Sequence, residues 1–143
     1  MTQSQLLLSE THPQSGRWVI VQDNGTSVWL YLTERASQAI AADCWLWNRI
    51  AAPGNPADYA SQGLAPPAPK GMITTLGTVT DTLPTVMTRW RWDGNAVALL
   101  VADQAIAFIS ADQKRGYCRH LRTVGPWGNP FDAKRYRRLF EEL

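Results

Sequence analysis

The residues most able to do chemistry gather in one stretch, 112–131, between a strand-like run and a helical pattern. Cys118 and His120 lie two residues apart there, so a strand would place both side chains on one face. Such a pair could form a thiolate nucleophile, but it also needs an oxyanion hole and an orienting third group. No segment of the sequence has a pattern that indicates either of these. Asp43 and Asp112 are candidates for the third group only by residue type. We therefore expect a protein that is not an enzyme, with ligand binding or catalysis at Cys118 and His120 as an alternative.

Metal and cofactor motifs are absent from the sequence. Two histidines and two cysteines, at positions 12, 44, 118 and 120, do not have the spacing of a zinc site. The segment 125–128, Gly-Pro-Trp-Gly, lacks the strand, the glycine pattern and the Lys-Ser/Thr of a phosphate-binding loop. Its glycines instead suggest a turn that leads the chain into a helix, with Trp127 packed at the helix-to-sheet junction. We expect neither a metal nor another cofactor.

The N-terminus has no positive region and too short an apolar run for a signal peptide. No apolar run approaches the ~20 residues of a membrane-spanning helix. We therefore expect a cytoplasmic protein without a membrane partner. In that reducing compartment Cys44 and Cys118 are expected to be free, buried thiols.

Positive charge is concentrated near the C-terminus. Residues 112–143 hold eight Lys and Arg against four acids, whereas the rest of the chain has six bases and eight acids. A chain polarised in this way can present a basic face to an acidic partner. The residues expected to contact the partner are Arg115, Tyr117, Arg119, Arg122, Trp127, Arg135 and Arg138.

The leading hypothesis is a non-enzymatic protein-binding module that acts through this arginine and aromatic surface. Nucleic-acid binding by the basic C-terminal helix is an alternative. A net charge of +2 and a pI near 8.7 are low for a nucleic-acid binder. Zinc-finger, helix-turn-helix and RRM-like patterns are also absent.

Two tryptophan pairs alternate along strand-like runs. Trp45 and Trp47 share one side of the run 43–48, and Trp90 and Trp92 share one side of the run 85–92. These indoles belong to the core if both sides of the strands are covered. If one side is open, they form a recognition patch beside arginines.

The strand pattern begins with a hairpin at 17–33, where Asp23-Asn24-Gly25 suits a tight turn between two β-branched and aromatic runs. Strands are further expected at 41–49, 85–92, 96–101 and 105–109, and an irregular or edge segment at 73–79. Turns are expected at Asp93-Gly94-Asn95 and Asp103-Gln104. Residues 1–16 suit either a flexible tail or an edge strand, and the five prolines of 51–71 predict a loop.

A helix is expected at the C-terminus, with Asn129 as its N-cap, Pro130 at its first position and Asp132 favouring the helix dipole. Its buried stripe comprises Phe131, Tyr136, Leu139, Phe140 and Leu143. The fold class is therefore α+β: one domain, 1–143, with a mainly antiparallel sheet of about six strands and an amphipathic helix packed on it. An exposed sheet edge would allow a monomer or a homodimer.

Four segments together resemble a group of small bacterial proteins of uncharacterised function. They are Ala42–Asn48, the run from Trp92 to Leu100, Arg115-Gly116-Tyr117-Cys118-Arg119, and Gly125-Pro126-Trp127-Gly128. The similarity covers roughly residues 17–131. It implies a bacterial cytosolic protein with no known activity and assigns no catalytic residue. Small bacterial proteins of this size often serve as partners, including immunity proteins that neutralise a toxin.

Overall fold

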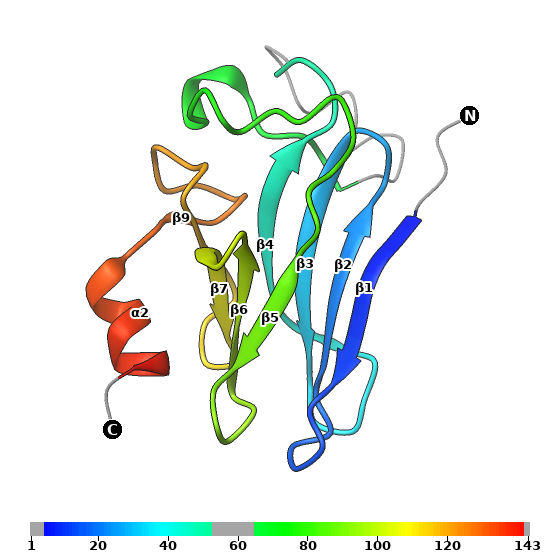
Figure 1. The fold of residues 1–143 in the computed structure, drawn as a ribbon, viewed down its shortest axis with the longest axis vertical. Helices are drawn as coiled ribbons and strands as arrows, with labels where there is room; N and C mark the ends of the chain where they lie inside the picture. Colours follow the sequence, from blue (N-terminus) through cyan, green and yellow to red (C-terminus); the bar gives the residue numbers. More distant parts are fainter. Residues whose placement is uncertain (1–4, 53–64, 142–143) are drawn as a thin grey trace.

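Residues 5–52 and 65–141 are described by a computed structural model in which nine strands form two sheets (Figure 1). The first sheet is antiparallel, in the order β1 (Gln5–Thr11), β2 (Trp18–Asp23), β3 (Ser27–Thr33), β4 (Ile40–Asn48). The second follows the order β5 (Met87–Trp90), β6 (Ala96–Val101), β7 (Gln104–Ser110), β8 (Tyr117–Cys118), β9 (Asn129–Pro130). The helix α2 (Ala133–Phe140) and the short 3₁₀ helix η1 (Lys70–Met72) complete it. The expected fold class is confirmed, with more strands than the expected six.

The first hairpin forms as expected because Asn24 organises its turn. Its side-chain oxygen accepts hydrogen bonds from the backbone N–H groups of Thr26 and Ser27, at 3.0 and 2.9 Å. Gly25 adopts a φ of 91°, which residues with a side chain rarely take. β1 pairs antiparallel with β2, so residues 5–11 form an edge strand rather than a tail.

The two hairpins of the second sheet also turn through positive φ. Gly94 (φ 76°) turns the chain from β5 into β6, as the sequence predicts. Between β6 and β7 the turn residues are Ala102 (φ 50°) and Asp103 (φ 66°). Gln104 already pairs within β7, so this turn lies one residue earlier than expected.

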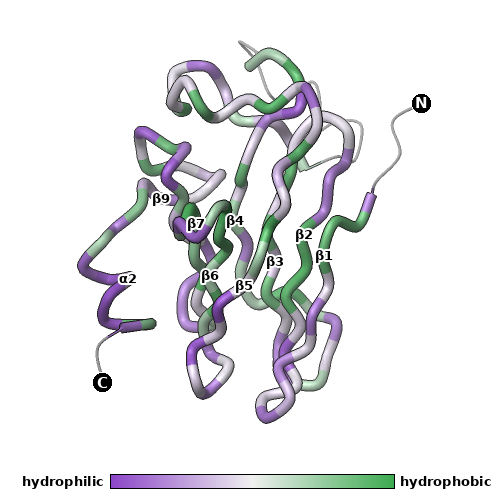
Figure 2. Tube along the Cα trace, in the orientation of Figure 1, coloured by the Kyte–Doolittle hydropathy of each residue, from purple (hydrophilic) through white to green (hydrophobic). Residues whose placement is uncertain are grey.

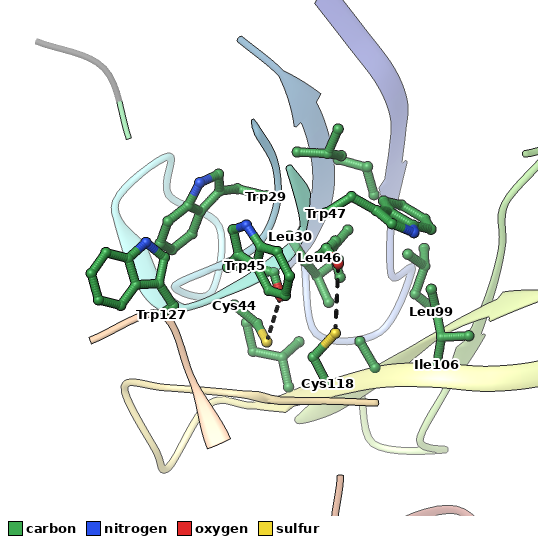
Figure 3. Close-up of a cluster of buried hydrophobic side chains, with 14 of the residues drawn as sticks. Trp29, Leu30, Cys44, Trp45, Leu46, Trp47, Leu99, Ile106, Cys118 and Trp127 are labelled. Atoms are coloured by element: carbon green, nitrogen blue, oxygen red, sulfur yellow. Dashed lines mark hydrogen bonds between the residues drawn. The ribbon is translucent and has the colours of Figure 1, made fainter. Parts of the chain in front are cut away.

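The core lies between the two sheets. Figure 2 shows hydrophobic residues along the central strands and hydrophilic ones along much of α2. β4 contributes five consecutive buried side chains, Cys44, Trp45, Leu46, Trp47 and Asn48, and Figure 3 shows the first four. Both sides of β4 are covered because Leu46 bulges out of the pairing with β3, where Val28 pairs with Trp47 and Trp29 with Trp45, which interrupts the alternation of β4. The second sheet also packs against β4.

Backbone hydrogen bonds join the two sheets along β4. Asp43 donates its N–H to the oxygen of Lys114 at 2.9 Å and accepts from the N–H of Gly116 at 2.8 Å. Trp45 donates its N–H to the oxygen of Trp127 at 2.9 Å. The segment 114–127 is therefore held against the edge of the first sheet, which fixes the position of the candidate functional residues.

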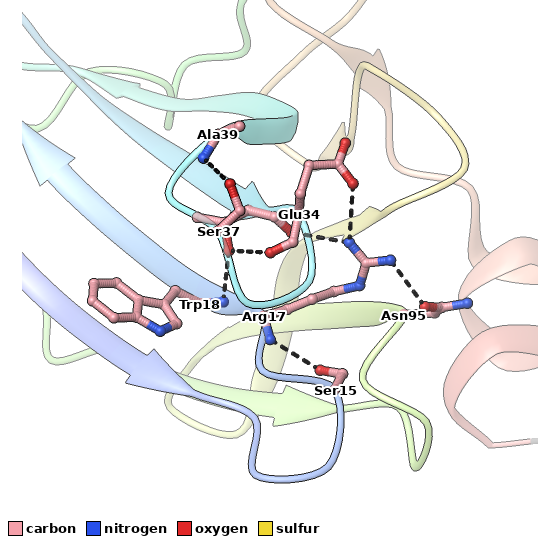
Figure 4. A network of polar contacts seen from close by, with 8 residues as sticks. Ser15, Arg17, Trp18, Glu34, Ser37, Ala39 and Asn95 are labelled. Carbon is pink, nitrogen blue, oxygen red and sulfur yellow. Dashed lines mark hydrogen bonds and ion pairs between the residues drawn. The ribbon is translucent and has the colours of Figure 1, made fainter.

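A buried arginine, Arg17, links the two sheets at the end of the sandwich where the β5–β6 turn lies (Figure 4). The guanidinium of Arg17 donates to the backbone oxygen of Thr33 at 3.0 Å and to the side chain of Asn95 at 3.4 Å. Glu34 lies 3.7 Å away from it. Because Asn95 follows the β5–β6 turn, this network ties the first sheet to the second.

The helix begins later than the sequence suggested. Asn129 and Pro130 pair in parallel with Tyr117 and Cys118 as β9, so neither caps the helix. Asp132 is the N-cap, and its side chain accepts from the N–H of Arg135 at 3.1 Å. Pairing with β8 holds the backbone of Asn129 and Pro130 in extended sheet geometry, so the helix starts only after these residues.

α2 packs on the second sheet, on the side away from the first sheet (Figure 1). Tyr136 is buried there against Phe108 of β7, while Phe131, Leu139 and Phe140 are half-buried around them. Four members of the expected stripe thus line the contact, and the fifth, Leu143, lies outside the described residues.

The Pro-rich region is described only in part, because 53–64 lie outside the described residues. Residues 65–69 are irregular, and 73–79 form no strand but make two isolated bridges. Ile73 pairs with Leu121, and Thr78 pairs with Asn48. These bridges place the segment across one end of the sandwich.

Candidate partner-binding surface

An aromatic cluster underlies the predicted surface. Tyr117 of β8 stacks on Phe108 with ring centroids 4.8 Å apart, and its hydroxyl donates to Gln113 at 2.9 Å. Phe131 meets Phe108 edge-on at 5.2 Å, and Tyr136 lies 5.6 Å from Phe131. These rings pack in the offset and edge-on arrangements that aromatic pairs prefer, so they form a firm base for the arginines.

Two of the predicted arginines lie over these rings. The guanidinium carbon of Arg119 is 3.8 Å from the centroid of Phe131, and its Nε–H donates to the oxygen of Ala105 at 2.6 Å. Arg135 lies over Tyr117 at 5.3 Å. A cation above an aromatic face is attracted by the ring quadrupole, which restrains both arginine side chains.

The basic face comprises Arg119, Lys134, Arg135, Arg137 and Arg138. Arg135 is half-buried, and the other four are exposed. Among the described residues, Arg135 alone of the five has a carboxylate within 4.0 Å, that of Asp132 at 3.9 Å.

Arg89 of β5 fixes the C-terminal end of the helix beneath this face. It donates to the backbone oxygen of Phe140 at 2.7 Å and to the hydroxyl of Tyr136 at 3.3 Å. A cation at a helix C-terminus interacts favourably with the helix dipole. The basic residues of α2 are thus presented by a helix held at both ends.

Three of the predicted residues lie elsewhere. Arg115 binds the carboxylate of Asp43 at 2.6 Å, and Arg122 lines a separate cavity. Trp127 is only 9% exposed, and its indole N–H donates to the oxygen of Pro66 at 2.9 Å. It fills the junction between β4 and the Pro-rich segment, not the helix-to-sheet junction, so it does not belong to the surface (Figure 3).

Asp43 and Tyr31 lie opposite each other on β4 and β3. Burial raises the pKa of Asp43, although the Arg115 guanidinium acts in the opposite direction. Burial, with the nearby Asp43 charge, raises the pKa of Tyr31 to about 12. Arg115 therefore compensates a partly desolvated carboxylate, which makes it a structural residue first.

Cys118 and His120 are both buried, but they do not form an activated pair. The Cys118 thiol and the His120 ring Nδ1 both approach the backbone oxygen of Leu46, at 3.8 and 2.9 Å. Burial raises the pKa of Cys118 to about 12 and lowers the pKa of His120. A neutral thiol beside a neutral ring that already binds a carbonyl argues against nucleophilic chemistry here. Cys44 and Cys118 are free, as expected.

The two tryptophan pairs differ in their exposure. Trp45 and Trp47 belong to the core, where Trp45 donates its indole N–H to Asn48 at 2.9 Å. Trp90 is half-buried with its ring 5.1 Å from that of His12, and Trp92 is 79% exposed. Trp92 follows the end of β5, so the alternation of that strand no longer sets its direction.

One further feature gave no signal in the sequence. A cavity of about 530 Å³ lies at the end of the sandwich, between the segments 70–78 and 51–52 and the side chain of Arg122. Lys70, Thr74, Thr75 and Thr78 line it, and none of them was a candidate from the sequence. The bridge between Ile73 and Leu121 brings these segments together, and pairing between distant segments leaves no local pattern.

Within residues 5–52 and 65–141, no three His, Cys, Asp or Glu side chains gather to hold a metal ion. No helix in these two ranges is long and apolar enough to cross a membrane. Comparisons with family models, curated proteins and solved structures found no match to this chain. The resemblance to small bacterial proteins therefore stays a prediction.

Proposed function

We propose that this protein is a non-enzymatic binding module that holds an acidic protein partner through its basic face. The observation that supports this most is the position of Arg119 and Arg135, each over an aromatic ring. Two arginines restrained before binding lose less conformational freedom in a complex than mobile side chains do. Arg138, exposed on the same helix, adds a cation with no carboxylate near it among the described residues.

A protein partner fits this face better than a nucleic acid. Single-stranded nucleic acids are bound largely by stacking bases on exposed aromatic rings. Here Arg119 covers Phe131, and Tyr117 lies between Phe108 and Arg135, so both rings are already occupied. Planar guanidinium groups match carboxylates in two-point contacts, which suits a surface rich in Asp and Glu. The partner class is thus an acidic-surfaced protein; a toxin held by its immunity protein is one instance.

The test is affinity capture from an extract of the source organism, with wild-type protein and the double variant Arg119→Glu, Arg138→Glu. The matched control is Arg35→Glu, Lys70→Glu, which makes the same change in net charge at two exposed cations outside the basic face, between β3 and β4 and in η1. We expect one stoichiometric protein with wild type and control, and on the order of a hundredfold weaker binding for the double variant.

Two results would contradict the proposal. Equal capture by the double variant would mean that the basic face is not the binding surface. A captured fraction that disappears on nuclease treatment, with affinity falling steeply with salt, would assign the face to nucleic acid instead.

A further inference from the structure

The cavity at the end of the sandwich has the composition of an anion site. Lys70 and Arg122 lie at its rim, and Thr74, Thr75 and Thr78 line its wall. Among the described residues that line it there is no carboxylate, so none of these neutralises the two cations. Ile73 contributes an apolar surface. The volume of about 530 Å³ lies within the range of small-molecule sites.

The cations and hydroxyls are held in place by pairing between distant segments. The N–H of Arg122 donates to the oxygen of Met72 at 2.7 Å, and the N–H of Thr74 donates to the oxygen of His120 at 2.9 Å. These bonds flank the bridge between Ile73 and Leu121. The segments that carry Lys70 and Arg122 therefore form one rigid unit.

The opposite wall is fixed by the end of β4. Asn48 donates its N–H to the oxygen of Gly77 at 2.8 Å and accepts from the N–H of Val79 at 2.8 Å. Arg49 binds the oxygen of Val79 at 2.5 Å, which secures the same segment. Thr78 lies between these contacts, so its hydroxyl is presented by a backbone that is held on both sides.

Within residues 5–52 and 65–141, the polar side chains of the lining make no hydrogen bond or ion pair with one another or with the rest of the protein. In the part of the chain that the structure describes, no hydrogen bond involves the side chains of Lys70, Thr74, Thr75, Thr78 or Arg122. No carboxylate in that part lies within 4.0 Å of either cation. A bound anion would thus gain charge-assisted hydrogen bonds without breaking existing ones.

We propose that this cavity binds a small organic phosphate, a monoester with an apolar body. A phosphate dianion carries the two negative charges that Lys70 and Arg122 would neutralise, and its three terminal oxygens match the additional hydroxyl donors. A carboxylate would neutralise only one of these cations. The cavity is much larger than inorganic phosphate, so an organic group would fill the remainder and contact Ile73.

The site is independent of the proposed function, because no residue of the basic face lines it. The test is NMR titration of the whole protein with phenyl phosphate, inorganic phosphate and benzoate, followed through the backbone amides of Thr74, Thr75 and Thr78. We expect saturable shifts at these amides, with phenyl phosphate binding more tightly than either of the other two. Lys70→Gln and Arg122→Gln should each weaken phenyl phosphate about tenfold, which is the usual loss for one charge-assisted contact.

Arg138→Gln is the matched control, since it removes one exposed cation from the basic face, and it should leave the affinity unchanged. Equal affinity of wild type and Arg122→Gln for phenyl phosphate would overturn the proposal, as would the absence of saturable shifts at the three threonines. Shifts confined to α2 and sensitive to Arg138→Gln would place the anion on the basic face and would also overturn it. Benzoate binding as tightly as phenyl phosphate would contradict the assignment to phosphate.

Discussion

Asn48 should be among the most sensitive positions in the chain, because its buried amide holds the loop 65–69 to the core. Its side-chain oxygen accepts from the indole N–H of Trp45 at 2.9 Å and from the N–H of Ala68 at 2.8 Å. Its amide nitrogen donates to the oxygen of Ala68 at 2.8 Å. The residue is fully buried, so water cannot replace these bonds in the folded state.

The substitution Asn48→Leu removes all three side-chain bonds with little change in volume. It leaves the indole N–H of Trp45 and both backbone groups of Ala68 without their partner. A buried polar group left unsatisfied costs about 1–3 kcal/mol. Three such groups predict a loss of about 3–9 kcal/mol, because Trp45 and Ala68 are themselves fully buried and leave no surface for water. For a chain of this length the midpoint of thermal unfolding should fall by roughly 10 °C or more.

The measurement is the free energy of unfolding from urea denaturation, with thermal unfolding as a second probe. The matched control is Asn129→Leu, the same substitution at a half-buried amide that donates to the oxygen of Gly116 at 3.1 Å. That oxygen keeps the N–H of Asn129 at 2.9 Å, so the control should cost about 1 kcal/mol or less. If Asn48→Leu costs no more than the control, the amide of Asn48 does not hold the loop 65–69 to the core and this reasoning is refuted.

Three further predictions concern close packing and titration. Gly116→Ala should lower the free energy of unfolding by about 2 kcal/mol, because a Cβ there would lie 2.7 Å from a backbone oxygen of β7. Gly71→Ala is the control, since the space around Gly71 is open, and it should leave the free energy of unfolding nearly unchanged in the same urea titration. Burial lowers the pKa of His120 below its ordinary 6.5, so the unfolded chain binds this proton more readily. Stability should therefore be full above pH 6.5 and fall as the pH drops from 6.5 toward the folded pKa; a His120→Gln variant that shows the same fall would contradict this. With the pKa of Cys118 at about 12, about one Cys118 thiol in ten thousand is ionised at pH 8. Burial raises the pKa of Cys44 well above its ordinary value as well, so iodoacetamide should label neither thiol until the chain unfolds. Rapid labelling of folded protein would show an activated thiol and would revive the enzyme alternative.

The parts of the fold that the sequence predicts are those set by neighbouring residues. The side chain of Asn24 and the positive φ that Gly25 and Gly94 tolerate determine two of the turns locally. These two hairpins could therefore be predicted correctly from the sequence. The apolar runs of β6 and β7 are long enough to show as buried strands. Such local signals do not depend on where the rest of the chain lies.

The division into two sheets depends on pairing between distant segments. β8 and β9 have two residues each, too few to show any periodicity, and they pair in parallel across a long connection. That pairing also explains the wrong N-cap, because Asn129-Pro130 has the residue types of a helix start but forms sheet with Tyr117-Cys118. At Asn129 and Pro130, pairing with a distant segment therefore determines the structure, although the residue types favour a helix start.

The candidate surface was predicted in part for the same reason. Helical periodicity placed Arg135 and Arg138 off the buried stripe, and proximity in sequence put Tyr117 beside Arg119. Trp127 was misplaced because its partner, the oxygen of Pro66, comes from a loop whose path no local pattern reveals. A single exposed tryptophan and a buried one look alike in a sequence.

The most direct test of the proposed function is site-specific photo-crosslinking in the source organism. A benzophenone amino acid is introduced at Arg138 on the basic face and, as a control, at Arg35, which is exposed between β3 and β4. An acidic protein partner predicts one discrete adduct from position 138 that protease removes and nuclease leaves intact, with none from position 35. Equal adducts from both positions, or an adduct that nuclease removes, would contradict binding of a protein at the basic face.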